Sequence, residues 1–192
     1  AELINTGPPD PPNALDASRG MREYLEPIVE DRRHNPGDDL ISDLVHAEID
    51  GHQLTDEKIY GFLRLLLPAG AETTYRVMGN ALVALLTHPD TMAEVVGDRS
   101  LVPAVIEETL RWESSVTQVS RVAAADKEIA GCPVESGAPV SVLVGSANHD
   151  EARYEAPEEW RIDRPPHHHV AFGTGQHQCL GMHLARLELR VG

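Results

Sequence analysis

The stretch AFGTGQHQCLGMHLAR, residues 171–186, decides which fold this sequence predicts. Gly173 and Gly175 permit backbone angles that other residues avoid, so we expect a tightly folded loop in its first half. Apolar residues then recur at helical spacing, at Leu180, Leu184, Leu187 and Val191. Cys179 stands where this helix is expected to begin, and the positive end of a helix dipole favours a thiolate. Gly181 leaves space for a large planar ligand close to the backbone.

Three interpretations of Cys179 compete. A free thiol is most often a buried structural residue. A zinc site is the second possibility, because His177 and His183 lie close to Cys179 in the sequence. Further nitrogen donors for such a site follow one another in the chain as His167, His168 and His169. The third possibility is an axial thiolate to haem iron, a ligand that donates electron density and favours cleavage of an O–O bond.

The full pattern of the loop favours the haem thiolate. It reads F-x-x-G-x-x-x-C-x-G, as Phe172, Gly175, Cys179 and Gly181. A zinc site needs ligand spacing but has no use for that phenylalanine or those glycines. The pattern resembles the haem-binding signature of the cytochrome P450 monooxygenases in their soluble bacterial form. This resemblance implies haem b (iron protoporphyrin IX) as the cofactor, Cys179 as its iron ligand, and Phe172, Gly173 and Gly181 as haem-binding residues.

A second motif lies in the longest predicted helix. Thr55 is its expected N-cap, and apolar or small residues continue from there to Leu86. An interruption is expected at residues 68–70, where a proline and a glycine weaken the helix. Polar Glu72 and Thr73 follow directly, and such threonines commonly bond back to a carbonyl one turn earlier. The string AGAETT also resembles the oxygen-activation motif of the same family. That resemblance implies that Glu72 and Thr73 pass protons inward.

A third motif is the pair Glu108 and Arg111, which are three residues apart on one face of a predicted helix over residues 101–112. An exposed pair of this kind contributes only a few tenths of a kcal/mol. The string EETLR, however, resembles the E-x-x-R motif of the family, whose pair binds a second arginine downstream. The matching residue is Arg164, and the implied role of all three is structural.

Strands are expected after residue 112, over residues 116–122 and 139–144. Arg121 is either a solvated strand arginine or, as the resemblance implies, a partner of His177 in binding the haem propionates. The resemblance also implies an apolar substrate pocket, lined by Leu67, Ala69, Val116 and Val119. Cys132 is expected to lie in a turn and to be inert. Three positions depart from the family pattern, namely Ser115, His149 and Trp160.

The whole chain is expected to be mainly α-helical with a small β portion, in the cytochrome P450 fold. Residues 1–15 are expected to form a loop, and shorter helices are expected over residues 16–35, 39–47 and 90–97. The resemblance covers residues 16–192. Because members of the family are about twice as long, residues 1–192 are expected to be one partial domain, the haem-binding half, truncated at both ends.

Composition excludes several other classes of protein. The net charge of −15 argues against a nucleic-acid partner, and no apolar run approaches the roughly 20 residues of a membrane helix. Two cysteines and an N-terminus without a signal-peptide pattern favour the cytoplasm. Residues 161–192 hold four arginines and two acidic residues, a net +2 that leaves −17 on the remainder. A basic face around Cys179 would attract an acidic partner protein, although chance scatter explains this charge equally well.

The resemblance implies a haem-thiolate monooxygenase. Such an enzyme inserts one atom of dioxygen into an apolar small molecule, by hydroxylation or dealkylation. It takes electrons from a ferredoxin-type donor that is served by an NAD(P)H-dependent reductase. Two alternatives are a zinc site formed by His177, Cys179 and His183, and a non-catalytic truncated fragment.

Overall fold

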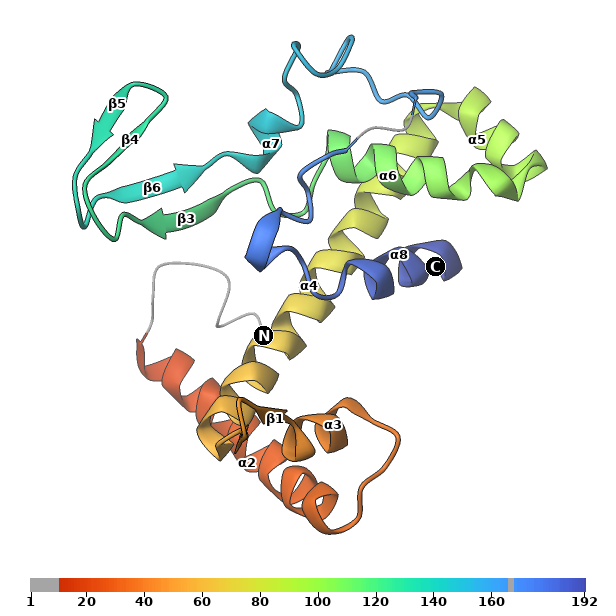
Figure 1. The fold of residues 1–192 in the computed structure, drawn as a ribbon. Helices are drawn as coiled ribbons and strands as arrows, with labels where there is room; N and C mark the ends of the chain where they lie inside the picture. Colours follow the sequence, from red (N-terminus) through yellow and green to blue (C-terminus); the bar gives the residue numbers. More distant parts are fainter. Residues whose placement is uncertain (1–10, 166–167) are drawn as a thin grey trace. The chain divides into compact units, whose positions relative to one another are not determined.

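The computed structural model describes residues 11–165 and 168–192 (Figure 1). The described residues fall into two compact units, one ending at Glu72 and the other beginning at Thr73. The boundary between the units falls inside one long helix, α4 (Asp56–Thr87). Among the described residues, no helix is both long enough and apolar enough to cross a membrane.

The first unit packs two helices against the N-terminal part of α4. They are α2 (Pro11–His34) and α3 (Leu40–His46), and Figure 1 shows α3 beside α2 in the orange part of the ribbon. The core of this unit is aliphatic apart from one tyrosine, and consists of Leu25, Val29, Val45, Ile59, Tyr60 and Leu63. Asp39 caps α3, because its carboxylate accepts a 2.9 Å hydrogen bond from the backbone N–H of Ser42.

A short hairpin separates α3 from α4. Strand β1 (Glu48–Ile49) pairs antiparallel with β2 (His52–Gln53). The two residues of the turn, Asp50 and Gly51, have φ angles of 54° and 76°. Both angles are positive, as a two-residue hairpin turn of this kind requires, and an Asp-Gly pair adopts them readily.

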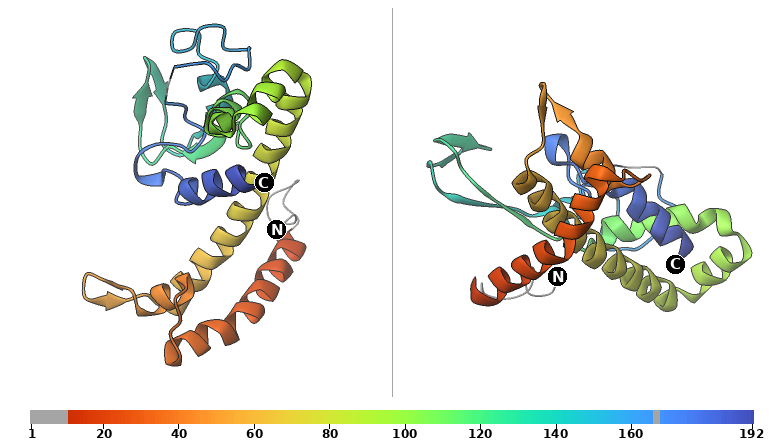
Figure 2. Two further views of the ribbon diagram at one scale, coloured as in Figure 1. Left: turned by 90° about the vertical axis from the view of Figure 1, so that its right-hand side faces the viewer. Right: turned by 90° about the horizontal axis from the view of Figure 1, so that it is seen from below.

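The second unit is built on the C-terminal part of α4, where α5 (Pro89–Gly97), η1 (Arg99–Leu101) and α6 (Val102–Trp112) follow. Val77, Ile106 and Leu110 form one buried cluster, and a second is centred on Trp160. The indole N–H of Trp160 donates to the hydroxyl of Thr109 at 3.2 Å, so the polar atom of this buried ring has a hydrogen-bond partner. The last helix, α8 (Met182–Val191), lies against α6 (Figure 2).

Two small antiparallel ribbons complete this unit. Strand β3 (Val119–Val122) pairs with β6 (Pro139–Val142), and β4 (Lys127–Ile129) pairs with β5 (Cys132–Val134). A one-turn helix, α7 (Val144–Ala147), follows β6. The strands are largely exposed, so they contribute little to the core of the unit.

Several sequence-based expectations about secondary structure need correction. Helix α2 begins at Pro11 rather than at residue 16, because proline is well tolerated in the first turn of a helix. Residues 1–10 of the expected loop lie outside the described residues. The expected interruption at residues 68–70 is absent, since α4 runs through Pro68 without a break. Cys132 begins strand β5 rather than lying in a turn.

Candidate functional site

The cysteine loop, residues 168–181, presents the sulfur of Cys179 to solvent. The backbone N–H of Cys179 donates to the carbonyl of Phe172 at 2.8 Å, which closes the loop on itself. Gly173 and Gly175 have φ angles of 67° and 73°, a region in which a side chain would be strained. The loop also contains a single turn, η2 (Gly175–His177), whose residues are exposed. Cys179 is exposed, so it is not a buried structural thiol in this structure.

Helix α8 begins later than the sequence suggested. Its first residue is Met182 and its N-cap is Gly181, so Cys179 lies in the loop before the helix. A turn at Leu180 and Gly181 occupies residues that periodicity had assigned to the helix. Gly181 has a φ of −85° and open space where a side chain would project. Glycine at position 181 therefore matters because it has no side chain, and not because the backbone there needs an unusual angle.

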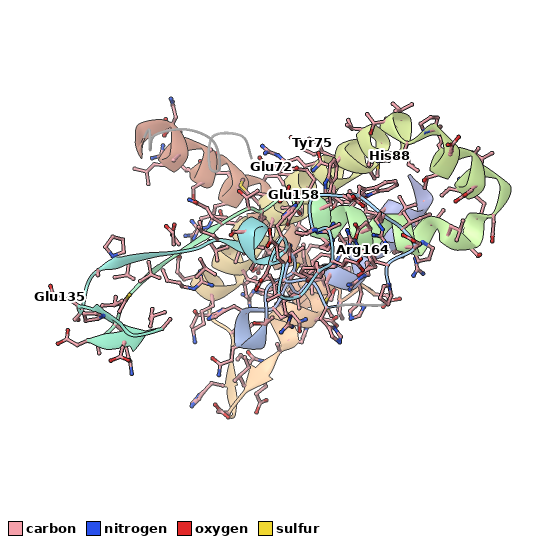
Figure 3. All side chains as sticks on the ribbon, turned by 90° about the horizontal axis from the view of Figure 1, so that it is seen from above. Glu72, Tyr75, His88, Glu135, Glu158 and Arg164 are labelled. Atoms are coloured by element: carbon pink, nitrogen blue, oxygen red, sulfur yellow. The ribbon has the colours of Figure 1, made fainter. Side chains whose placement is uncertain are left out.

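The structure brings Glu108, Arg111 and Arg164 together in the interior of the second unit. Arg111 forms two bonds to the carboxylate of Glu108, at 2.9 Å from Nε and 2.8 Å from Nη2. Arg164 donates from Nε to the same carboxylate at 2.9 Å, and the exposed fractions of the Glu108 and Arg164 side chains are 2% and 6%. Figure 3 shows Arg164 beside α6. One carboxylate is thus the counter-charge of two buried guanidinium groups.

The remaining donors of Arg111 bind backbone carbonyls. Nη1 donates to the carbonyls of Asn148 and Pro157, at 3.0 and 2.8 Å, and Nη2 donates to that of Glu159 at 3.0 Å. All five N–H groups of this fully buried guanidinium therefore have an acceptor. Burial raises the pKa of Glu108, but the hydrogen bonds from Arg111, from the backbone of Arg161 and from Arg164 outweigh that effect and lower the pKa.

Asn148 links this cluster to the start of the cysteine loop. The side-chain oxygen of Asn148 accepts from the N–H of Val170 at 2.8 Å, while its backbone carbonyl accepts from Arg111. Asn148 is completely buried, and its side-chain nitrogen has no hydrogen-bond partner in the structure. The buried charges on α6 and the backbone of the loop are thus joined through one residue.

Sequence reasoning missed the role of a second carboxylate on α6. Glu107 accepts two bonds from Arg186 of α8, at 2.6 and 2.8 Å, and a third from Nε2 of His169 at 3.2 Å. Partial burial raises the pKa of Glu107, but these hydrogen bonds outweigh it and lower the pKa to about 2. The sequence signal for this role was that Glu107 precedes Glu108 directly on the helix. Two adjacent carboxylates face different directions and therefore bind different partners.

The other predicted site residues are placed as follows. Glu72 and Thr73 are consecutive residues of α4, half-buried, at the end of the first unit and the start of the second. Figure 3 labels Glu72 and Tyr75, one turn apart on that helix. Arg121 is exposed on β3, and its guanidinium donates to the carbonyl of Ser120 at 2.8 Å. His177 is exposed in η2.

The residues expected to line a substrate pocket do not share one environment. Val116 and Val119 are half-buried before and at the start of β3, whereas Leu67 and Ala69 are exposed on α4. The second unit contains an open cavity of about 860 Å³ between α4, α6 and α8. Neither Cys179 nor any of these four residues lines it. That cavity is therefore separate from the cysteine loop.

A zinc site finds no support in the described residues. No group of three or more His, Cys, Asp or Glu side chains among them is arranged to hold a metal ion. His167, one of the candidate donors, lies outside the described residues. His177, Cys179 and His183 are all exposed, but they do not converge.

The comparison with protein families decides the identity of the fold. The family model described as Cytochrome P450 matches residues 13–192. The chain belongs to the cytochrome P450 family. The predicted fold class, mainly α-helical with a small β portion, is thereby confirmed.

Curated P450 proteins of bacteria are similar over most of this chain. The Steroid C26-monooxygenase of Mycolicibacterium smegmatis is 40% identical over 177 residues, which are 92% of this chain and 44% of that protein. Cytochrome P450 107B1 of Saccharopolyspora erythraea is 41% identical over 182 residues, which are 94% of this chain and 45% of that protein. The chain thus spans about half the length of the curated P450 relatives that it matches.

Solved P450 structures agree with this fold. Ligand-free cytochrome P450 TbtJ1 has a TM-score of 0.92 and 38% identity, covering 99% of this chain and 51% of that one. CYP109E1 from Bacillus megaterium in complex with testosterone has a TM-score of 0.88 and 40% identity, covering 92% of this chain and 49% of that one. The expectation that this P450 chain corresponds to about half of its relatives is confirmed.

The residues of this P450 fit a haem. A haem iron takes one axial ligand from such a loop, and Cys179 is a single exposed sulfur with no competing cluster of ligands among the described residues. A side chain added at Gly175 or Gly181 would meet nothing within 4 Å, so the surface of the loop is open to a flat ligand. The donor set and the shape of the loop therefore suit the cofactor that the family implies.

Proposed function

We propose that this chain is the haem-binding half of a monooxygenase that inserts one oxygen atom into an apolar small molecule. The observation that carries the proposal is the exposed sulfur of Cys179 on a loop closed by the bond to Phe172. When bound, haem b would supply the redox chemistry of dioxygen cleavage, which a thiolate ligand favours by donating electron density. The protein residues would hold, insulate and orient it.

Individual residues have proposed roles. Cys179 would be the iron ligand, and Phe172, Gly173 and Gly181 would form the surface beneath the cofactor. Arg121 and His177 would bind the propionates, because a guanidinium and an imidazole are suitable donors to carboxylates. The support for Arg121 is that it is exposed and that its guanidinium donates to the backbone carbonyl of the adjacent Ser120.

Glu72 and Thr73 would move protons. An acid and an alcohol at consecutive helix positions can hold a water molecule and transfer a proton through it. Both side chains are half-buried on α4, which would keep such a water ordered. Glu108, Arg111 and Arg164 have a structural role in this proposal, since their buried cluster anchors the segment that leads to the cysteine loop.

The substrate would be apolar and of about the size of a steroid. One similar protein is named Steroid C26-monooxygenase, and CYP109E1 has been solved with testosterone and with corticosterone. Leu67, Ala69, Val116 and Val119 would supply apolar surface for such a substrate. Electrons would come from a ferredoxin-type protein and an NAD(P)H-dependent reductase, attracted to the basic segment 161–192. We place the enzyme in the cytoplasm on its two free cysteines.

The test uses the protein as its host makes it. Haem-loaded protein is reduced, treated with carbon monoxide and examined for the Soret band that a thiolate ligand produces. Cys179→Ser should abolish that band, and the matched variant Cys132→Ser should keep it, because Cys132 is exposed on a separate ribbon. A thiolate band that survives in Cys179→Ser would contradict the proposal. Added testosterone should then shift the Soret band of the oxidised protein.

A further inference from the structure

Glu107 of α6 binds one residue at the start of the cysteine loop and one in the helix that follows the loop. His169 lies at the start of the loop and Arg186 lies in the helix that follows it, and both donate to the carboxylate of Glu107. The side chain of His169 is 3% exposed, and those of Arg186 and Glu107 are 27% and 39% exposed. A single carboxylate therefore binds residues on both sides of Cys179 in the sequence.

The hydrogen bonds assign the proton on His169. Its Nδ1 accepts from the backbone N–H of Ala171 at 3.2 Å, so the proton of the neutral ring resides on Nε2. That proton is donated to Glu107. The carboxylate thus accepts three bonds, and its negative charge is the counter-charge of Arg186.

Arg186 connects this carboxylate to the cysteine. Its guanidinium carbon lies 4.7 Å from the centre of the ring of Phe172, and the carbonyl of Phe172 accepts the N–H of Cys179. The hydrogen bond to Glu107 is the main cause that raises the pKa of Arg186, and the charge of Cys179 also raises it. The cation therefore packs against the residue whose carbonyl holds the backbone of Cys179.

We propose that Glu107 and Arg186 are an opposed charge pair that tunes the reduction potential of the iron bound by Cys179. The proposal rests on the proposed function, because it requires a haem ligated by that sulfur. The positive charge of Arg186 stabilises the reduced site, which has one more negative charge than the oxidised site. The negative charge of Glu107 offsets most of that effect. Neutralising either member should therefore shift the potential, and the two shifts should have opposite signs.

The experiment is a one-electron titration of the haem-loaded protein with dithionite and redox mediators. Glu107→Gln leaves the arginine uncompensated and should favour reduction by about threefold to tenfold in the equilibrium constant. Arg186→Gln leaves the carboxylate uncompensated and should disfavour reduction by a similar factor. The double variant should return to within about twofold of the parent. Arg190→Gln is the matched control, since it removes the same charge from an exposed residue of the same helix.

The outcomes separate this inference from the proposed function. A parent protein without the carbon monoxide band of a thiolate ligand would overturn both. A normal band with shifts of the same sign, or no shift, in Glu107→Gln and Arg186→Gln would overturn only the charge pair, because loss of structure alone gives no sign reversal. If Arg186→Gln fails to load haem, Arg186→Lys, which keeps the charge, should stay within about twofold of the parent. A reduction potential of Arg186→Lys that differs from the parent would then overturn the inference. An unchanged reduction potential in Glu107→Gln would do the same.

Discussion

The Nε atom of Arg164 lies 2.9 Å from Oε1 of Glu108, across 56 residues of sequence, and both side chains are almost fully buried. Arg111 shares the same carboxylate, so one negative charge serves two cations. An uncompensated charge in such a place is costly, because the interior solvates ions poorly. This contact joins α6 to the segment that leads into the cysteine loop.

Replacing Glu108 with glutamine should destabilise the protein strongly. The variant leaves Arg111 and Arg164 buried without a counter-charge, and the loss of one partner in a buried pair typically costs about 3–5 kcal/mol. The free energy of unfolding in urea measures the effect. Arg161→Gln is the control, because its partner Asp163 is exposed and the pair should contribute less than about 1 kcal/mol. Equal losses in the two variants would contradict the central role of Glu108.

Stability should fall at acidic pH through the adjacent glutamates of α6. The pKa of Glu107 is lowered from 4.5 to about 2, and that of Glu108 is lowered as well. A lowered folded-state pKa contributes stability that is complete above the unfolded value and lost as pH falls through the folded value. For Glu107 the loss should therefore occur between about pH 4.5 and pH 2.

The matching measurement is the free energy of unfolding at pH 7, 5, 4 and 3. Glu107→Gln should be less stable than the parent at pH 7, and its stability should decline less steeply below pH 4.5. An identical decline in both proteins would show that Glu107 does not supply the effect. Asp90→Asn, at an exposed residue of α5 outside this network, is the control for removing one carboxylate.

Two glycines of the cysteine loop should respond differently to alanine. Gly175 has a φ of 73°, so Gly175→Ala should cost about 1–2 kcal/mol of stability. Gly181 has a φ of −85° and open space around it, so Gly181→Ala should leave the unfolding of the haem-free protein almost unchanged. The same variant should weaken haem binding, because its methyl group would meet the cofactor. Unchanged haem affinity in Gly181→Ala would place the cofactor elsewhere.

Replacing Thr73 should uncouple electron use from product formation. Thr73→Ala removes the alcohol proposed to relay protons, and proton transfer of this kind contributes about 100-fold or more to rate. The ratio of product formed to NAD(P)H consumed should fall, while the carbon monoxide spectrum should not change. Thr87→Ala is the control, since that hydroxyl bonds the carbonyls of Val83 and Ala84 at the far end of the same helix. An unchanged ratio in Thr73→Ala would remove Thr73 from the proposed relay.

The sequence by itself determined the family, most helices and the pattern of the cysteine loop. These features depend on near neighbours: helical spacing over residues 102–112, positive φ at Gly173 and Gly175, and the interval between Phe172 and Cys179. The conformational preference of a residue depends on its neighbours within a few positions, so it can be read from the sequence. Resemblance to the family also indicated that Arg164 was the distant partner of Glu108.

Tertiary structure alone decided which charges meet and where elements begin. The bond between Glu107 and Arg186 spans 79 residues, and no local pattern encodes it. Helix α4 continues through Pro68, although proline favours a break, and α8 starts at Met182 because the loop before it is closed by the bond from Cys179 to Phe172. Packing energy can override local preference, and it exists only once distant segments are in contact.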